Sequence, residues 1–188
     1  MVKLGPDHPL SLECRNNLGK VNEAIGGWSE AEDLYRRTLA GRLRTVNPDN
    51  PFLAGDRALL GHLLLEQSRW SEAEPLLREA LAILAKAAPD DWQRYDAMSL
   101  LGAALIGQGR LAEAESLIVP GYEGIRLREP RIAAPDQFHL LEAAVRVVHL
   151  YEAWDKTDKA TEWKAKLGLA DLPVDPFATP RTGRTVRQ

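Results

Sequence analysis

The sequence lacks the features that mark secreted, membrane-spanning or nucleic-acid-binding proteins. Its single cysteine, Cys14, cannot form an internal disulfide. The N-terminal stretch MVKLGPDHPL has no apolar core, so it is not a signal peptide. No apolar run approaches the roughly 20 residues that span a bilayer. The net charge of -3 gives no sign of a nucleic-acid or membrane surface. We therefore expect a cytoplasmic protein with no nucleic-acid partner and no membrane insertion.

The sequence also lacks the spacings that carry chemistry. No two of the four histidines lie at the spacing of a zinc-binding HExxH helix, and no cysteine pair exists. GAALIGQG, at residues 102–109, is not followed by Lys-Ser or Lys-Thr, so it is not a phosphate-binding loop. Glu72 and Glu74 fit a helix start, where negative charge meets the positive end of the helix dipole. We expect no catalytic residues, no cofactor and no metal site.

The sequence does contain one short segment, here called the phrase, that is repeated several times. WSEAEDLYRRTL begins at Trp28 and WSEAEPLLREAL begins at Trp70, with eight of twelve positions identical. A third copy, GRLAEAESLI, covers residues 109–118, and a degenerate fourth copy is KTDKATEWKAKLG. Aligning the copies on one alanine gives steps of 42, 41 and 46 residues, at Ala31, Ala73, Ala114 and Ala160. A period of this size indicates stacked structural units.

Each copy of the phrase reads as the start of a helix. Ser29 with Glu32, and Ser71 with Glu74, have the spacing of a capping box. A Leu-Gly pair precedes each of the first three copies, on an earlier helical pattern. A glycine at that place, such as Gly102, would let the neighbouring helix approach closely. Each unit is therefore predicted to be a first helix, a short turn and a second helix.

These patterns predict an all-α fold, a right-handed α-solenoid of about four stacked antiparallel helix pairs. Proline-bearing links bound the units at about 9–47, 51–88, 91–129 and 135–168. Residues 1–8 are interpreted as the end of a preceding repeat or a linker, and residues 169–188 as a disordered tail. Pro120 predicts a kink or break in the third unit's second helix.

The pattern resembles the tetratricopeptide repeat. The leucine-glycine pair, the alanine of the second helix and a later small residue stand at Leu60, Gly61, Ala73 and Ala80. The period exceeds the usual ~34 residues. Together with LGPDHPLSLECRNNLG (residues 4–19) it looks like the kinesin-light-chain variety, which has extended helices and is also widespread in bacterial proteins.

A narrower resemblance is to the C-terminal repeats of bacterial eukaryotic-like serine/threonine protein kinases. RWSEAEPLLREALAI, GQGRLAEAESLIVPGYEG and LYEAWDKTDKATEWKAKLGL carry this likeness. The chain has no glycine-rich phosphate loop, HRD loop or DFG motif, so kinase activity does not transfer to it.

The resemblance implies a non-catalytic scaffold that binds a protein or peptide on a concave face lined by the first helices. The candidate residues on that face are Asn16, Asn17, Lys20, Glu23, His62, Ser99, Arg146 and His149. The alternative is a regulatory or substrate-recruiting segment of a serine/threonine kinase, with a kinase domain as partner.

The N-terminal edge suggests a second kind of contact. The first unit is expected to expose apolar side chains, and exposed apolar area drives association. The candidates are Leu10, Leu12, Leu18, Leu34 and Tyr35. We therefore expect self-association through this edge, or early fraying of the first unit.

Overall fold

The computed structural model describes residues 5–168, and this part of the chain is all-helical. The helices are α1 (Pro9–Ala24), α2 (Trp28–Thr45), α3 (Pro51–Glu66), α4 (Trp70–Ala87), α5 (Trp92–Gly107), α6 (Leu111–Arg128), α7 (Phe138–Ala153) and α8 (Thr157–Leu167). Two 3₁₀ turns, Glu129–Arg131 and Ala134–Asp136, join α6 to α7. The predicted all-α class is confirmed. The predicted tail lies outside the described residues.

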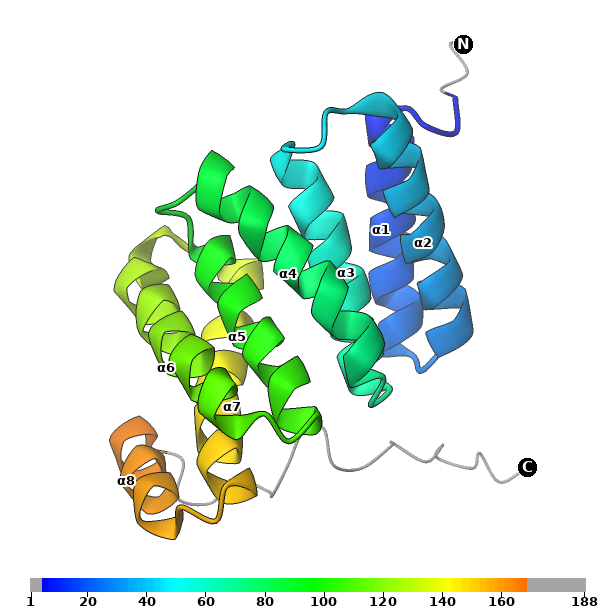
Figure 1. Cartoon of the computed structure of the whole chain (residues 1–188). Helices are drawn as coiled ribbons and strands as arrows, with labels where there is room; N and C mark the ends of the chain where they lie inside the picture. The colour runs from blue at the N-terminus through cyan, green and yellow to red at the C-terminus, as the bar shows by residue number, and fades with distance from the viewer. Residues whose placement is uncertain (1–4, 169–188) are drawn as a thin grey trace, which may run out of the picture.

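The helices pack as four consecutive pairs, each pair beside the next (Figure 1). The first helix α5 contacts both α3 and α7, whereas the second helices α2, α4, α6 and α8 make at most marginal contacts with one another. The first helices are therefore closer together, and the stack curves towards them. We call the side lined by α1, α3, α5 and α7 the inner face. The solenoid architecture predicted from the repeats is confirmed.

A glycine brings the two helices of a unit together in each of the first three pairs. A Cβ atom built on Gly61 would lie 2.8 Å from both Cγ and Cδ2 of Leu77, closer than real Cβ contacts. The equivalent contacts are Gly19 with Tyr35 and Gly102 with Ile118. The predicted close approach at Gly102 is confirmed, since its Cβ would meet the Ile118 Cγ1 at 2.2 Å.

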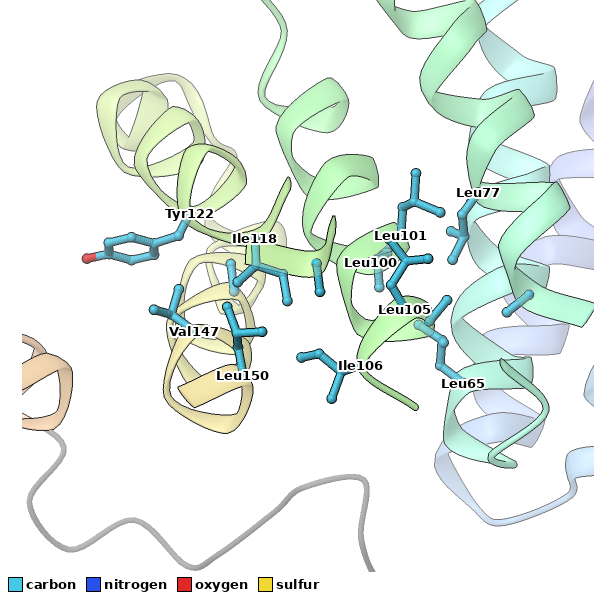
Figure 2. Close-up of a cluster of buried hydrophobic side chains, with 14 of the residues drawn as sticks. Leu65, Leu77, Leu100, Leu101, Leu105, Ile106, Ile118, Tyr122, Val147 and Leu150 are labelled. Carbon is cyan, nitrogen blue, oxygen red and sulfur yellow. The ribbon is translucent and has the colours of Figure 1, made fainter. Parts of the chain in front are cut away.

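The alanines that define the period lie in the core. Ala31, Ala73 and Ala114 are fully buried, and Ala160 is 4% exposed. Around them a continuous apolar cluster runs through the units, and Figure 2 shows its section from α3 to α7. Because one pair cannot cover its own apolar face, this shared core holds neighbouring pairs together.

The predicted capping boxes are wrong. Both serines lie inside the first helical turn, because α2 begins at Trp28 and α4 at Trp70. The residues before these helices, Gly27 and Arg69, make no side-chain cap. Side-chain capping instead occurs at α1, α3 and α5, where His8, Asn50 and Asp91 accept a hydrogen bond from a backbone N–H two residues on.

The glutamates of the expected capping boxes link neighbouring units instead. Each accepts from the basic residue that directly precedes the next unit's second helix, because a charged donor outcompetes a backbone amide. Glu32 accepts from Arg69 at 2.6 Å, and Glu74 accepts from Arg110 at 2.8 Å. At the third junction the equivalent Glu115 accepts from Tyr151 and Lys159 instead, and it forms only a 3.9 Å ion pair with Lys156.

The predicted break at Pro120 does not occur, since α6 is continuous from Leu111 to Arg128, while the alternative of a kink stays a prediction. Pro120 is on the exposed side of the helix, where water can bond the carbonyl that the missing N–H leaves free. The opposite side of α6 packs against α5. A Cβ on Gly124 would lie 2.0 Å from the Tyr95 ring, so α6 packs closely on α5 around the proline.

The predicted exposed edge is right for two side chains and wrong for two. Leu10 and Leu18 are 54% and 52% exposed. Leu12 and Tyr35 are each 1% exposed. Leu12 packs against Gly41 of α2, and the Tyr35 ring lies over Gly19 of α1. Leu34 is half-buried.

The tie at Glu74 predicts a pH-dependent contribution to stability. Hydrogen bonds from Gln108, Arg78 and Arg110 outweigh burial and lower the pKa of Glu74 to about 2. A lowered pKa stabilises the fold above the unfolded value of about 4.5, and this gain is lost as the pH falls towards 2. We expect Glu74→Gln to cost about 1 kcal/mol at neutral pH, because its partners are partly exposed.

Denaturant unfolding at several pH values measures this cost. The difference between wild type and Glu74→Gln should shrink as the pH falls below about 4. The control is Glu123→Gln on the exposed side of α6, which should change stability little at any pH. A Glu74→Gln cost that is absent at neutral pH, or constant with pH, would contradict the tie.

Candidate functional site

One equivalent position of each first helix presents a side chain on the inner face. These positions are Lys20 on α1, His62 on α3, Ala103 on α5 and His149 on α7. Lys20 is exposed and the other three are half-buried. The inner face is therefore a surface to which all four units contribute.

A buried carboxylate joins α1, α2 and α3 beside this row. Asp56 of α3 is 2% exposed, and its Oδ1 accepts a hydrogen bond of 2.7 Å from the Asn16 amide of α1. Its other oxygen accepts from the Arg42 guanidinium of α2, which is also buried. The aspartate charge is compensated by these donors, so this group holds the first two units in register.

A second polar contact lies further along α1 and α3. The Glu23 carboxylate accepts a hydrogen bond of 2.8 Å from the Tyr35 hydroxyl and lies 3.1 Å from His62 Nδ1. Burial, and then the charge of Glu23, raise the pKa of Tyr35. The Glu23 and His62 side chains keep 16% and 26% of their surface exposed. This pair can therefore meet both its structural partner and a ligand.

A third group lies between α5 and α7. The fully buried Arg146 places Nη2 2.9 Å from Glu142 Oε2, and Nη1 3.3 Å from Ser99 Oγ and 3.6 Å from Asp96 Oδ1. His139 Nδ1 lies 3.2 Å from Asp96 Oδ2. Burial raises the pKa of Asp96, but His139 and Arg146 hold it below its ordinary value.

The Glu23–His62 contact and the group around Arg146 are electrostatically linked across the inner face. Burial lowers the pKa of His62, but the hydrogen bond to Glu23 and the charge of Glu142 outweigh it. The pKa of His62 is therefore raised above its ordinary value. Because Glu142 belongs to α7 and Glu23 to α1, side chains of the first and fourth units act on one imidazole of the second unit. The inner face gathers charges from units far apart in the sequence.

The structure places the predicted site residues at different depths. Asn17 and Lys20 are exposed, and Asn16, Glu23, His62 and His149 are half-buried. Ser99 and Arg146 are both 0% exposed. These two side chains lie beneath the surface of the inner face, so they cannot contact a ligand there. The remaining six stay candidates.

Sequence reasoning missed four residues that organise this face. They are Asp56, Asp96, Glu142 and Arg42. One signal was available for the aspartates: each is an acidic residue inside the apolar run of a first helix, as in FLAGDRALL. A buried charge needs a partner, so such a position predicts a nearby cation.

The described residues set two limits on what this face can do. Within residues 5–168, no group of three or more His, Cys, Asp and Glu side chains could hold a metal ion. No helix in the same range combines the length and the apolar character required to cross a membrane. The arrangement offers hydrogen bonds, charge and a curved surface.

Comparison with known proteins shows what the repeats are similar to. The tetratricopeptide repeat family matches residues 11–52 and 57–91, which cover most of the first two units. This match agrees with the resemblance carried by the leucine-glycine pairs. No curated protein matches the sequence.

Solved structures show the same fold. A variant of a protein from Podosopora anserina, described as a kinesin light chain with nearly identical TPR-like repeats, superposes with a TM-score of 0.69 at 20% identity. The match covers 88% of this chain and 77% of that chain. BtubC (BKLC) from P. vanneervenii has a TM-score of 0.67 at 15% identity, over 95% of this chain and 71% of that one. These two likenesses show the fold, an α-solenoid of stacked helix pairs similar to that of these proteins.

The raised pKa of His62 predicts a pH-dependent contact. A histidine with a raised pKa stabilises the fold most below its unfolded value of ~6.5, and this gain is lost as the pH rises through the folded value. We expect His62→Gln to cost about 1 kcal/mol in mild acid and less in mild alkali, because the charged hydrogen bond to Glu23 is lost.

Urea unfolding on either side of neutrality measures this effect. The same substitution made in a Glu23→Gln background is the control, because there the imidazolium has lost its hydrogen-bonded carboxylate. In that background the extra acid cost should largely disappear. An equal cost of His62→Gln in both backgrounds would show that Glu23 is not the partner that matters.

Proposed function

We propose that this chain is a non-catalytic scaffold that binds a polypeptide segment of a partner protein along its inner face. One observation carries the proposal: the row Lys20, His62, Ala103 and His149 gives one accessible position from every unit on one curved side. A peptide that crosses the row can contact all four units at once. The match of the first two units to the tetratricopeptide repeat family supports this role.

The chemistry of the inner face indicates what kind of segment fits. Exposed or half-exposed side chains offer an amide at Asn17, an ammonium at Lys20 and carboxylates at Glu23 and Glu142. Charges of both signs lie along one surface, so a segment with both donors and acceptors suits it better than a purely apolar one. The buried groups at Asp56 and Arg146 keep this surface in one shape before binding.

A bulky side chain on the inner face should block the partner. We expect Ala103→Arg to abolish capture of proteins that the wild-type chain recovers from its source cells, because the new side chain fills the row. Ala103 is half-buried on α5 and makes no polar side-chain contact that its replacement would remove. Affinity capture with mass spectrometry, at equal helicity by circular dichroism, measures this.

The matched control is Ala85→Arg, the same change at an exposed position of α4, a second helix away from the inner face. It should leave capture intact. Equal recovery by both variants, or no recovery by the wild type, would contradict an inner-face binding site.

We also keep the kinase-linked role as a second candidate, supported by the resemblance of three stretches to the repeats of bacterial serine/threonine kinases. A kinase gene beside this one, and co-purification of its product with the chain, would support it. Failure to co-purify would contradict it. The bacterial origin and the cytoplasmic location stay predictions.

A further inference from the structure

One face of α1 carries an exposed apolar row that the inner-face site does not use. Leu10, Leu18, Val21 and Ile25 are 54%, 52%, 57% and 76% exposed, and Cys14 between them is exposed as well. Steps of three and four residues place these five side chains on one side of a helix. We call them the α1 stripe. Several large apolar side chains together in water mark an interaction surface.

The equivalent positions on the next helices show what such a stripe does. Leu18 corresponds to Leu60 on α3 and Leu101 on α5, and Val21 corresponds to Leu63 and Ala104. These four counterparts are at most 2% exposed, in a core that also contains Ala31, Tyr35, Ala73 and Leu77 of the preceding second helices. At Leu18 and Val21 the stripe therefore occupies positions that form the seam between units in α3 and α5.

The opposite end of the stack does not offer a matching surface. The exposed residues of α8 include Asp158, Lys159, Glu162 and Lys166. An apolar stripe packed against them would bury charges that the stripe itself cannot pair, which is costly. This disfavours a head-to-tail filament in which one copy's α8 covers the next copy's α1. A second copy's stripe offers a matching apolar surface.

The charges beside the stripe favour one orientation. Glu13 and Lys20 are both exposed, seven residues apart on the same flank of α1. When two such helices cross antiparallel, Glu13 of one copy meets Lys20 of the other at both ends. In a parallel two-fold arrangement the same flank of the two helices would lie on opposite sides of the interface, so these opposite charges would not pair.

We propose that a second copy of this chain docks on the α1 stripe, with the two α1 helices antiparallel across a two-fold axis. Such an interface is closed, since the same patch is used on both copies. α1 is 16 residues long, or about 24 Å, so one helix pair buries less than a standard protein–protein interface. The dimer is therefore weak and concentration-dependent. The dimer would share Lys20 with the inner-face row, whereas His62 on α3 and Ala103 on α5 are not on α1 and stay open.

Sedimentation velocity over a dilution series of the full chain tests the proposal. The wild type should shift from monomer to dimer as the concentration rises. Val21→Glu should remain a monomer throughout, with unchanged helicity because Val21 is exposed. Leu127→Glu, at a 70% exposed leucine of α6, is the matched control and should still dimerise. A wild type that is monomeric at every concentration, or a dimer that survives Val21→Glu, overturns the proposal.

A charge reversal tests the orientation. Glu13→Lys alone should weaken the dimer, because two lysines then meet at each end. Adding Lys20→Glu should restore it, since each pair is then opposite in charge again. A double variant that dimerises no better than the single one rejects the antiparallel arrangement. Ala103→Arg should leave the dimer unchanged, so failure of this proposal and failure of the inner-face site give different results.

Discussion

The close contact between a glycine of the first helix and a large side chain sixteen residues later sets the geometry of the first three units. It occurs in the first three units, as Gly19 with Tyr35, Gly61 with Leu77 and Gly102 with Ile118. A Cβ atom at any of these glycines would lie 2.2–2.8 Å from the partner side chain. The pair can therefore approach only because the glycine has no side chain. The resulting short distance between the two helices of a unit places the repeat alanines in the core. It also determines where the next unit packs.

Both proposed binding surfaces follow from this repeated packing. Because the second helices cover one side of the first helices, the other side of α1, α3, α5 and α7 remains as the inner face. Buried ion pairs at Asp56 and Arg146 stabilise that face, while Glu23 and His62 stay accessible at its surface. At α1 the seam between units has no helix packed on it within residues 5–168, which leaves the α1 stripe exposed.

The sequence predicted the helix pairs, and the repeat alanines are buried as expected, because a period of 41 or 42 residues constrains the first three units in the same way. The sequence did not correctly predict contacts that depend on residues of neighbouring helices. The role of Glu74 depends on Arg110, 36 residues away, and local spacing alone favoured a capping box. Pro120 is tolerated because its exposed side meets water while Gly124 packs on α5, which requires the tertiary structure. The burial of Ser99 and Arg146 depends in the same way on how α7 packs against α5.

A double-mutant cycle at Gly61 and Leu77 tests the central contact most directly. Gly61→Ala should cost about 1–3 kcal/mol of unfolding free energy through overlap. Leu77→Ala should cost about 2–5 kcal/mol through the cavity it leaves. The new methyl group of the first change partly fills the space opened by the second. The double variant should therefore be more stable than the sum of the single costs predicts, by about 1 kcal/mol or more. Strictly additive costs, or a Gly61→Ala variant as stable as the wild type, would contradict the claim that this contact sets the spacing of the helices.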